Sequence, residues 1–160
     1  GPKGFTKAVK SPTGVRAIGD GRFVFSDWEL NGIFVVRRGE MPERIALVDG
    51  AYGIDYRDGW VFFGDRTSER IMSVHVDSKR VRVLAEGELV KGVWQVAVHP
   101  DGSAVYWTQQ SPANAIRRVA IRAEDPPVAP RGETVLRLDA NPWGLAIIPV
   151  ESDQPSPLGP

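Results

Sequence analysis

The stretch AIGDGRFVFSD at residues 17–27 returns twice further along the chain, as DYRDGWVFFGD at residues 55–65 and as VHPDGSAVYWTQ at residues 98–109. The Asp-Gly pairs fall at positions 20, 58 and 101. Each unit is therefore roughly 40 residues long, a length typical of repeat architectures. In every copy one short apolar strand precedes the Asp-Gly turn and another follows it. Because glycine accommodates the positive φ that such a turn needs, each copy predicts a β-hairpin.

The second strand of each hairpin is apolar on both faces, as at 23–25, 61–63 and 105–107. A strand that does not alternate with polar residues must be covered on both sides, like the middle strands of stacked sheets. Two further strands follow in each unit, and the last is more polar, as expected of an outer edge. They are expected at 33–36 and 44–48, at 71–74 and 80–85, and at 116–119 and 134–138. The pattern predicts an all-β fold, a β-propeller fragment of about three four-stranded blades.

The expected blades occupy residues 13–50, 51–91 and 92–140, and residues 141–149 begin a fourth unit that does not finish. Residues 122–133 contain several prolines and predict an irregular surface loop between the last two strands of the third blade. At the ends of the chain, residues 1–12 combine a Gly-Pro start, typical of tag cleavage, with an outer strand expected at 5–9. Residues 151–160 predict a disordered tail.

The overall charge gives no reason to expect a nucleic-acid or membrane partner. Twenty basic and twenty acidic residues cancel, and the sequence pI is about 7.0. No whole-protein field therefore draws the chain to polyanions. Cysteine is absent, which excludes disulfides, thiolate metal sites and a cysteine nucleophile within this sequence. No apolar run approaches the ~18 residues of a membrane-spanning helix, so we expect no membrane insertion.

The end of each hairpin resembles the YWTD repeat of low-density-lipoprotein-receptor-type propellers. The third copy keeps Tyr-Trp-Thr but has Gln109 in place of the motif aspartate, and the first two copies keep the aspartate as Asp27 and Asp65. Arg118 matches the arginine of the Ile-x-Arg segment that follows in that family. Propellers of the NHL and gluconolactonase-like type share much of this pattern. The resemblance implies structural roles for these four residues and favours an extracellular or periplasmic location.

Aromatic residues recur where the inner strand of each following unit begins, at Tyr52, Trp94 and Trp143. Equivalent positions in successive blades face the same rim of the central channel, so we expect these three side chains to lie near one another. Aromatic rings at a rim suit recognition of a protein or small ligand. The same rings can also pack between blades, and the sequence leaves both roles open.

Metal and catalytic motifs are weak in this chain. Residues 27–32 imitate the opening of an EF-hand loop, but Arg38 stands where that loop needs a bidentate glutamate. His75 and His99 have no clustered metal ligands in the sequence, and Asp27 and Asp65 recur as turn residues would. The enzymatic alternative is a metal-dependent lactonase, because Asn141 and the residues after it resemble the Asn-Gly-Leu segment of such propellers.

The sequence favours a non-catalytic binding or assembly module without a cofactor, which presents the aromatic rim to a protein or small ligand. A metal-dependent hydrolase and a purely self-assembling scaffold are the alternatives. Closed propellers have typically four to eight blades, so three blades leave two apolar faces uncovered. We therefore expect a homodimer in which two chains complete a six-bladed ring.

Overall fold

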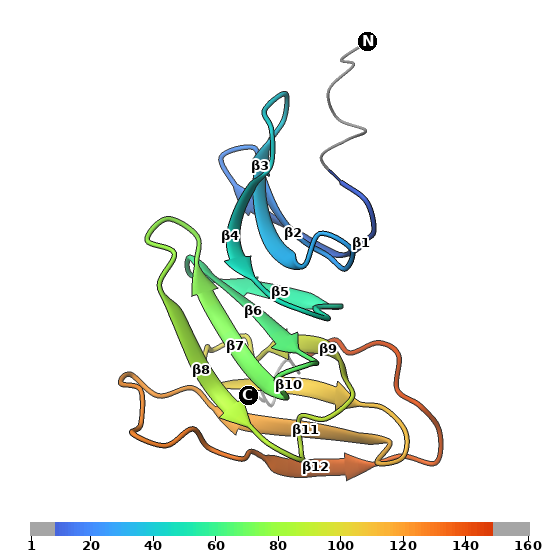
Figure 1. Cartoon of the computed structure of the whole chain (residues 1–160). Coiled ribbons are helices and arrows are strands. Elements are labelled where there is room, and N and C mark those ends of the chain that lie inside the picture. Colours follow the sequence, from blue (N-terminus) through green and yellow to red (C-terminus); the bar gives the residue numbers. More distant parts are fainter. Residues whose placement is uncertain (1–8, 149–160) are drawn as a thin grey trace, which may run out of the picture.

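The computed structural model describes residues 9–148 as three four-stranded antiparallel sheets (Figure 1). Each sheet follows sequence order from one edge to the other, and this up-and-down course is that of a propeller blade. The first sheet contains β1 (Pro12–Gly19), β2 (Arg22–Asp27), β3 (Gly32–Arg37) and β4 (Glu43–Leu47). The second contains β5 (Ile54–Arg57), β6 (Trp60–Asp65), β7 (Arg70–His75) and β8 (Val81–Glu86). The third contains β9 (Val93–Val98), β10 (Ala104–Gln109), β11 (Ala115–Ala120) and β12 (Glu133–Arg137).

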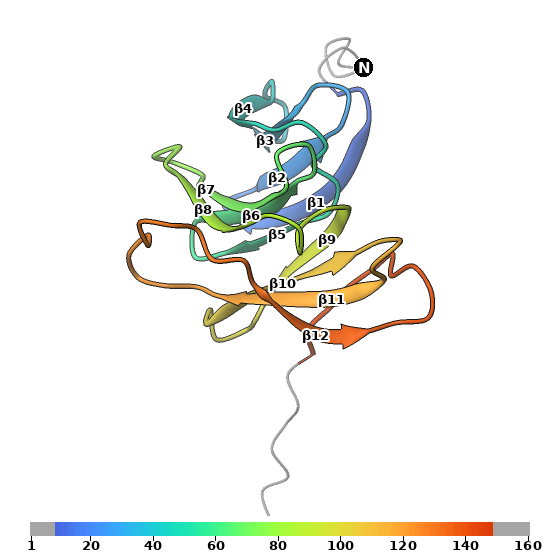
Figure 2. The ribbon, with the colours of Figure 1, turned by 60° about the horizontal axis from the view of Figure 1, so that its bottom comes forward.

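The sheets are arranged as successive blades, with β5 in contact with both β1 and β9 (Figure 2). The first strand of each sheet therefore lies toward the common axis, and the fourth strand forms the outer edge. This arrangement confirms the fold predicted from the repeats: residues 9–148 form an all-β propeller fragment of three four-stranded blades. The described residues contain no helix that is long and apolar enough to cross a membrane.

The Asp-Gly turns explain why the hairpins form where they do. Asp20 and Gly21 have φ of 52° and 68°, and Asp58 and Gly59 have φ of 47° and 84°. Positive φ at both central residues matches the twist of the flanking strands in a two-residue hairpin. The third turn is different, because residues 99–103 form a longer loop in which only Gly102 has positive φ, 77°.

The core lies between adjacent sheets in two clusters. Val24 and Ile33 of the first sheet pack with Val61 and Phe63 of the second. The other face of the second sheet packs against the third, around the fully buried Trp107. The indole Nε1 of Trp107 donates a hydrogen bond to the carbonyl of Leu89 at 2.8 Å, so even this ring leaves no polar atom unsatisfied. The middle strands are thus covered on both faces.

The insertion expected at residues 122–133 lies at 121–132, between β11 and β12. It is a loop, but it also crosses to the outer strand of the second blade (Figure 1). The amide of Glu86 donates to the carbonyl of Pro130 at 2.9 Å, and Arg82 Nε donates to Asp125 at 2.6 Å. The insertion therefore covers part of the β8 edge and ties the third blade to the second.

Residues 138–148 follow β12 and form no strand, although the sequence predicted the start of a fourth unit here. An inner strand needs a neighbouring strand to pair with, and the described chain supplies none at this point. The strand expected at residues 5–9 lies outside the described residues except for Val9, and the tail at 151–160 lies wholly outside them.

Candidate functional site

Four aromatic side chains form a continuous row at one end of the blades. The row consists of Trp28, Tyr52, Trp94 and Trp143, and successive ring centroids lie 4.7, 3.9 and 5.3 Å apart. Tyr52 and Trp94 are stacked with an interplanar angle of 22°, whereas Trp143 meets Trp94 edge to face at 88°. These are the offset-stacked and perpendicular arrangements that aromatic quadrupoles favour. We call this set the aromatic row.

The sheet topology explains why residues so far apart in sequence meet. In an antiparallel blade the end of the second strand and the start of the first lie at the same edge. Trp28 follows β2, Tyr52 precedes β5 and Trp94 lies at the start of β9. The amide of Gly53 donates to the carbonyl of Trp94 at 2.9 Å, which fixes the two inner strands side by side. Trp143 completes the row from the segment after β12.

Arg66 adds a cation to the row. Its guanidinium carbon lies 5.4 Å from the centroid of the Tyr52 ring and 5.7 Å from that of Trp94, within the range of cation–π contacts. Tyr52 and Trp94 are half-buried, but Trp143 is 63% exposed and Trp28 is also exposed. The row is therefore partly a packed structure and partly an open surface with a positive charge beside it.

The structure brings together all three residues proposed for the rim, Tyr52, Trp94 and Trp143. Sequence reasoning missed Trp28 and Arg66. Both follow directly after a motif aspartate, Asp27 or Asp65, so they occupy the same position in successive repeats. That shared position was the signal that could have placed them on the rim.

The motif residues make hydrogen bonds within the protein. Asp27 is fully buried and accepts from the amides of Lys10, Ser11 and Leu30 at 2.8 to 3.1 Å. Asp65 accepts from the amides of Thr67 and Ser68 at 3.1 and 2.9 Å. In both cases the carboxylate satisfies backbone donors at a turn, as an Asx-type residue does.

Gln109 occupies the same motif position in the third blade and uses both ends of its amide. Nε2 donates to the carbonyl of Glu88 at 2.9 Å, and Oε1 accepts from Arg117 Nε at 2.8 Å. Arg118, the arginine that the family resemblance singles out, instead forms an ion pair with Glu133 at 2.6 Å. Arg117 is therefore the arginine that contacts the motif position in this blade.

A cavity of about 470 Å³ opens between the second and third blades beside the aromatic row. Arg66, Lys91 and Arg117 line it together with Gln109 and the acidic side chains of Glu69 and Glu88. Because Arg66 belongs to both the cavity wall and the aromatic row, the two features are continuous.

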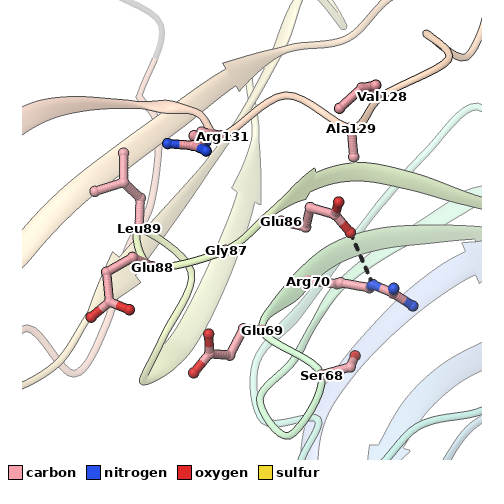
Figure 3. Close-up of a pocket in the computed structure, with 10 residues that line it drawn as sticks. All are labelled: Ser68, Glu69, Arg70, Glu86, Gly87, Glu88, Leu89, Val128, Ala129 and Arg131. Carbon is pink, nitrogen blue, oxygen red and sulfur yellow. Dashed lines mark hydrogen bonds and ion pairs between the residues drawn. The ribbon is translucent and has the colours of Figure 1, made fainter.

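A second hollow, of about 750 Å³, lies between the insertion and the second blade (Figure 3). Its wall on one side is formed by the insertion, through Val128, Ala129 and Arg131. The other side is formed by residues 68–70 at the β6–β7 turn and by residues 86–89 at and after the end of β8. Arg70 pairs with Glu86 at 3.3 Å on its wall. Glu88 and Arg131 are exposed, and none of the charged residues on its wall is buried.

The two histidines lie apart from the aromatic row. His75 packs edge to face on Trp60, with ring centroids 5.1 Å apart, and His99 Nδ1 lies 2.6 Å from Asp101 in the third hairpin turn. Hydrogen bonds from Ser103 lower the pKa of Asp101 to about 2. Within residues 9–148, no group of three or more His, Asp and Glu side chains is placed to hold a metal ion. Asn141, the residue suggested by lactonases, accepts from the amide of Ser111 at 2.7 Å.

Comparison with known proteins gives the fold. No family model and no curated protein sequence matches the chain. Among solved structures, a nidogen/laminin complex aligns at 17% identity with a TM-score of 0.67, covering 81% of this chain and 49% of that one. A putative 6-phosphogluconolactonase from Bacteroides uniformis aligns at 16% identity with a TM-score of 0.63, covering 93% of this chain and 48% of that one.

Virginiamycin B lyase from Staphylococcus aureus, in a catalytically inactive form with quinupristin, aligns at 13% identity with a TM-score of 0.64, covering 86% of this chain and 44% of that one. The chain therefore spans about half the length of these solved structures. At such low identity the similarity shows the β-propeller fold, which these proteins share while differing in function.

Proposed function

We propose that this chain is a non-catalytic binding module whose ligand, a protein segment or a small molecule, contacts the aromatic row. The observation that carries the proposal is the convergence of four aromatic rings and Arg66 from five separate segments on one end of the blades. Large exposed rings beside a cation are the anchors that binding surfaces use most often.

The partial exposure of the row supports recognition in addition to packing. Rings needed only to separate blades would be covered, as Trp107 is. Trp143, in contrast, rests on Trp94 by one edge and is 63% exposed, so a ligand can reach it without moving the blades. The half-buried Tyr52 and Trp94 would provide the rigid floor beneath it.

The experiment is a selection of binders from a random peptide library on the wild-type chain, followed by affinity measurements on variants. Trp143→Ala and Trp94→Ala should each weaken the selected binders by at least about tenfold, the size of a truncated aromatic anchor. Trp60→Ala is the matched control, because it removes a tryptophan that lies beside His75 at the opposite end of the second blade.

Three results would contradict the proposal. The first is a set of binders that hold the Trp94 and Trp143 variants as tightly as the wild type. The second is a stoichiometric calcium or zinc ion retained by the purified protein and lost on Asn141→Ala, which would favour the lactonase-like alternative. If the chain only self-assembles, the library should yield no binders to this surface.

A further inference from the structure

Arg117 is a charged residue at a position that the other blades fill with apolar side chains. It pairs across β10 and β11 with Trp107, just as Phe34 pairs with Phe25 and Met72 with Phe63. Arg117, Phe34 and Met72 are therefore structurally equivalent. Because Phe34 and Met72 serve the fold at this position, the blade itself does not require a cation there.

Among residues 9–148, the guanidinium of Arg117 is buried without a carboxylate to neutralise it. Arg117 is only 3% exposed. Its hydrogen bonds within the described chain run from Nε to Gln109 Oε1 and from Nη1 to Thr134 Oγ1, and both acceptors are neutral. No carboxylate among residues 9–148 forms an ion pair with it. A buried charge that lacks a counter-ion is costly, so its retention needs a reason.

The surroundings of Arg117 are positive. Burial lowers the pKa of Arg117, and the nearby charge of Arg137 lowers it further. The cavity of about 470 Å³ beside it is also lined by Arg66 and Lys91. Two acidic residues also lie on its wall. One of them, Glu88, already forms an ion pair with Lys91, with 3.9 Å between Oε1 and Nζ.

We propose that this cavity binds an anionic group, a carboxylate or a phosphate, that pairs with Arg117. The second terminal nitrogen of the guanidinium and the free hydrogen of Nη1 form an edge that can donate two parallel hydrogen bonds to such a group. Gln109 and Thr134 hold the guanidinium in place through Nε and Nη1. The site adjoins the aromatic row through Arg66 but does not depend on it.

The test measures thermal stabilisation by simple anions. Sodium phosphate and sodium acetate are titrated separately against the wild-type chain, with sodium chloride keeping the ionic strength constant. An anion that binds only the folded state raises the melting temperature in a saturable way, from which an apparent Kd follows. We expect saturable stabilisation by at least one of the two salts, and the effective salt identifies the chemical source as phosphate or carboxylate.

Arg117→Met should raise the apparent Kd by about ten- to a hundredfold, the range of one or two charge-assisted hydrogen bonds. Methionine occupies the equivalent position in the second blade, so this variant should fold. Arg118→Met is the matched control: it removes the same charge from the next residue on β11, which pairs with Glu133 instead. It should keep the anion effect. Arg117→Lys retains the charge and serves as the second variant in case the methionine variant does not fold. Its apparent Kd should lie between those of the wild type and Arg117→Met.

Three outcomes would overturn the proposal: no saturable effect of either salt on the wild type, an unchanged effect in Arg117→Met, or an equal loss in Arg118→Met. Trp143→Ala removes an exposed ring of the aromatic row that contacts Trp94 but does not line the cavity, so this variant should leave the response to both salts unchanged. Failure of the anion site and failure of the aromatic row as a binding surface are therefore seen in different variants.

Discussion

The carboxylates of Asp27 and Asp65 occupy the same repeat position but differ in what a substitution would leave unsatisfied. Asp27 uses Oδ2 for the amides of Lys10 and Ser11 and Oδ1 for that of Leu30. Asp65 uses Oδ1 alone for its two backbone donors. An asparagine at position 65 can keep its oxygen on those donors, whereas at position 27 its amide nitrogen must face at least one part-buried N–H group.

We therefore expect Asp27→Asn to lower the free energy of unfolding by about 1–3 kcal/mol, the cost of leaving part-buried donors unpaired around a buried side chain. Asp65→Asn should lower it by about 0.5–1 kcal/mol, the lower range for a turn or cap residue. Urea titration of both variants measures the difference. Equal losses, or a change in ligand affinity without a change in stability, would assign these residues a role other than turn formation.

At the residue scale, recurrence in the sequence identified which positions matter but not which side chains they contact. Asp27, Asp65 and Gln109 could be aligned because their repeats align. The partner of Gln109 depends on which face of β11 each arginine occupies, and that is set by pairing register. A shift of one residue exchanges Arg117 for Arg118, so a linear motif cannot distinguish them.

At the scale of strands and turns, the sequence predicted most of the fold because each repeat carries its own signals. Apolar runs covered on both faces, Asp-Gly turns and polar outer strands all indicate the same four-stranded unit. The insertion was expected as a loop, but its docking on β8 was not. That docking depends on pairs such as Arg82 with Asp125, which are distant in sequence and carry no local signal.

Asp125 should control whether the insertion stays docked. The hydrogen bond from Arg82 lowers the pKa of Asp125 below its ordinary value of 3.8, and burial only partly opposes this. A carboxylate with a lowered pKa in the folded state contributes stability above that ordinary value. The contribution is lost as the pH falls below 3.8 and through the folded-state pKa. The docked insertion should therefore loosen in acid below about pH 4.

Asp125→Asn should reproduce that loosening at neutral pH. The amide of Glu86, which donates to Pro130, should exchange its hydrogen about two- to fivefold faster, in line with the small contribution of an exposed ion pair. Hydrogen exchange resolved by NMR measures this, and Glu124→Gln serves as a neighbouring control. Unchanged exchange at Glu86 would mean that backbone contacts alone hold the insertion.

For the molecule as a whole, the exposure of equivalent residues in the three sheets shows that both outer faces of the stack are partly uncovered. On the face toward the next blade, Ile45 and Leu84 are buried in the first and second sheets, but the equivalent Val135 in the third is 50% exposed. On the opposite face, Val61 is buried whereas the equivalent Phe23 in the first sheet is 41% exposed. Both outer faces thus retain residues that a neighbouring blade would cover.

A second copy of the chain is the occupant we propose for these faces. The face of the first sheet that carries Phe23 is equivalent to the face of the second sheet that packs on the first. The face of the third sheet that carries Val135 is equivalent to the face of the second sheet that packs on the third. Two chains related by a twofold axis would therefore repeat the existing contacts between blades and close a six-bladed ring.

Sedimentation at micromolar concentration should accordingly show a compact dimer of twice 17.5 kDa. Phe23→Glu should convert it to a monomer, because a carboxylate buried against the partner's third sheet would lack a counter-ion. Met41→Glu is the matched control, since Met41 is exposed in the β3–β4 turn and borders Val76 and Asp77 of the same chain's second blade. Charged substitutions at Trp143 or Leu145 should also weaken the dimer if the segment after β12 crosses to the partner. A folded wild-type monomer at this concentration would refute ring closure by a second copy, and the open faces would then need another partner.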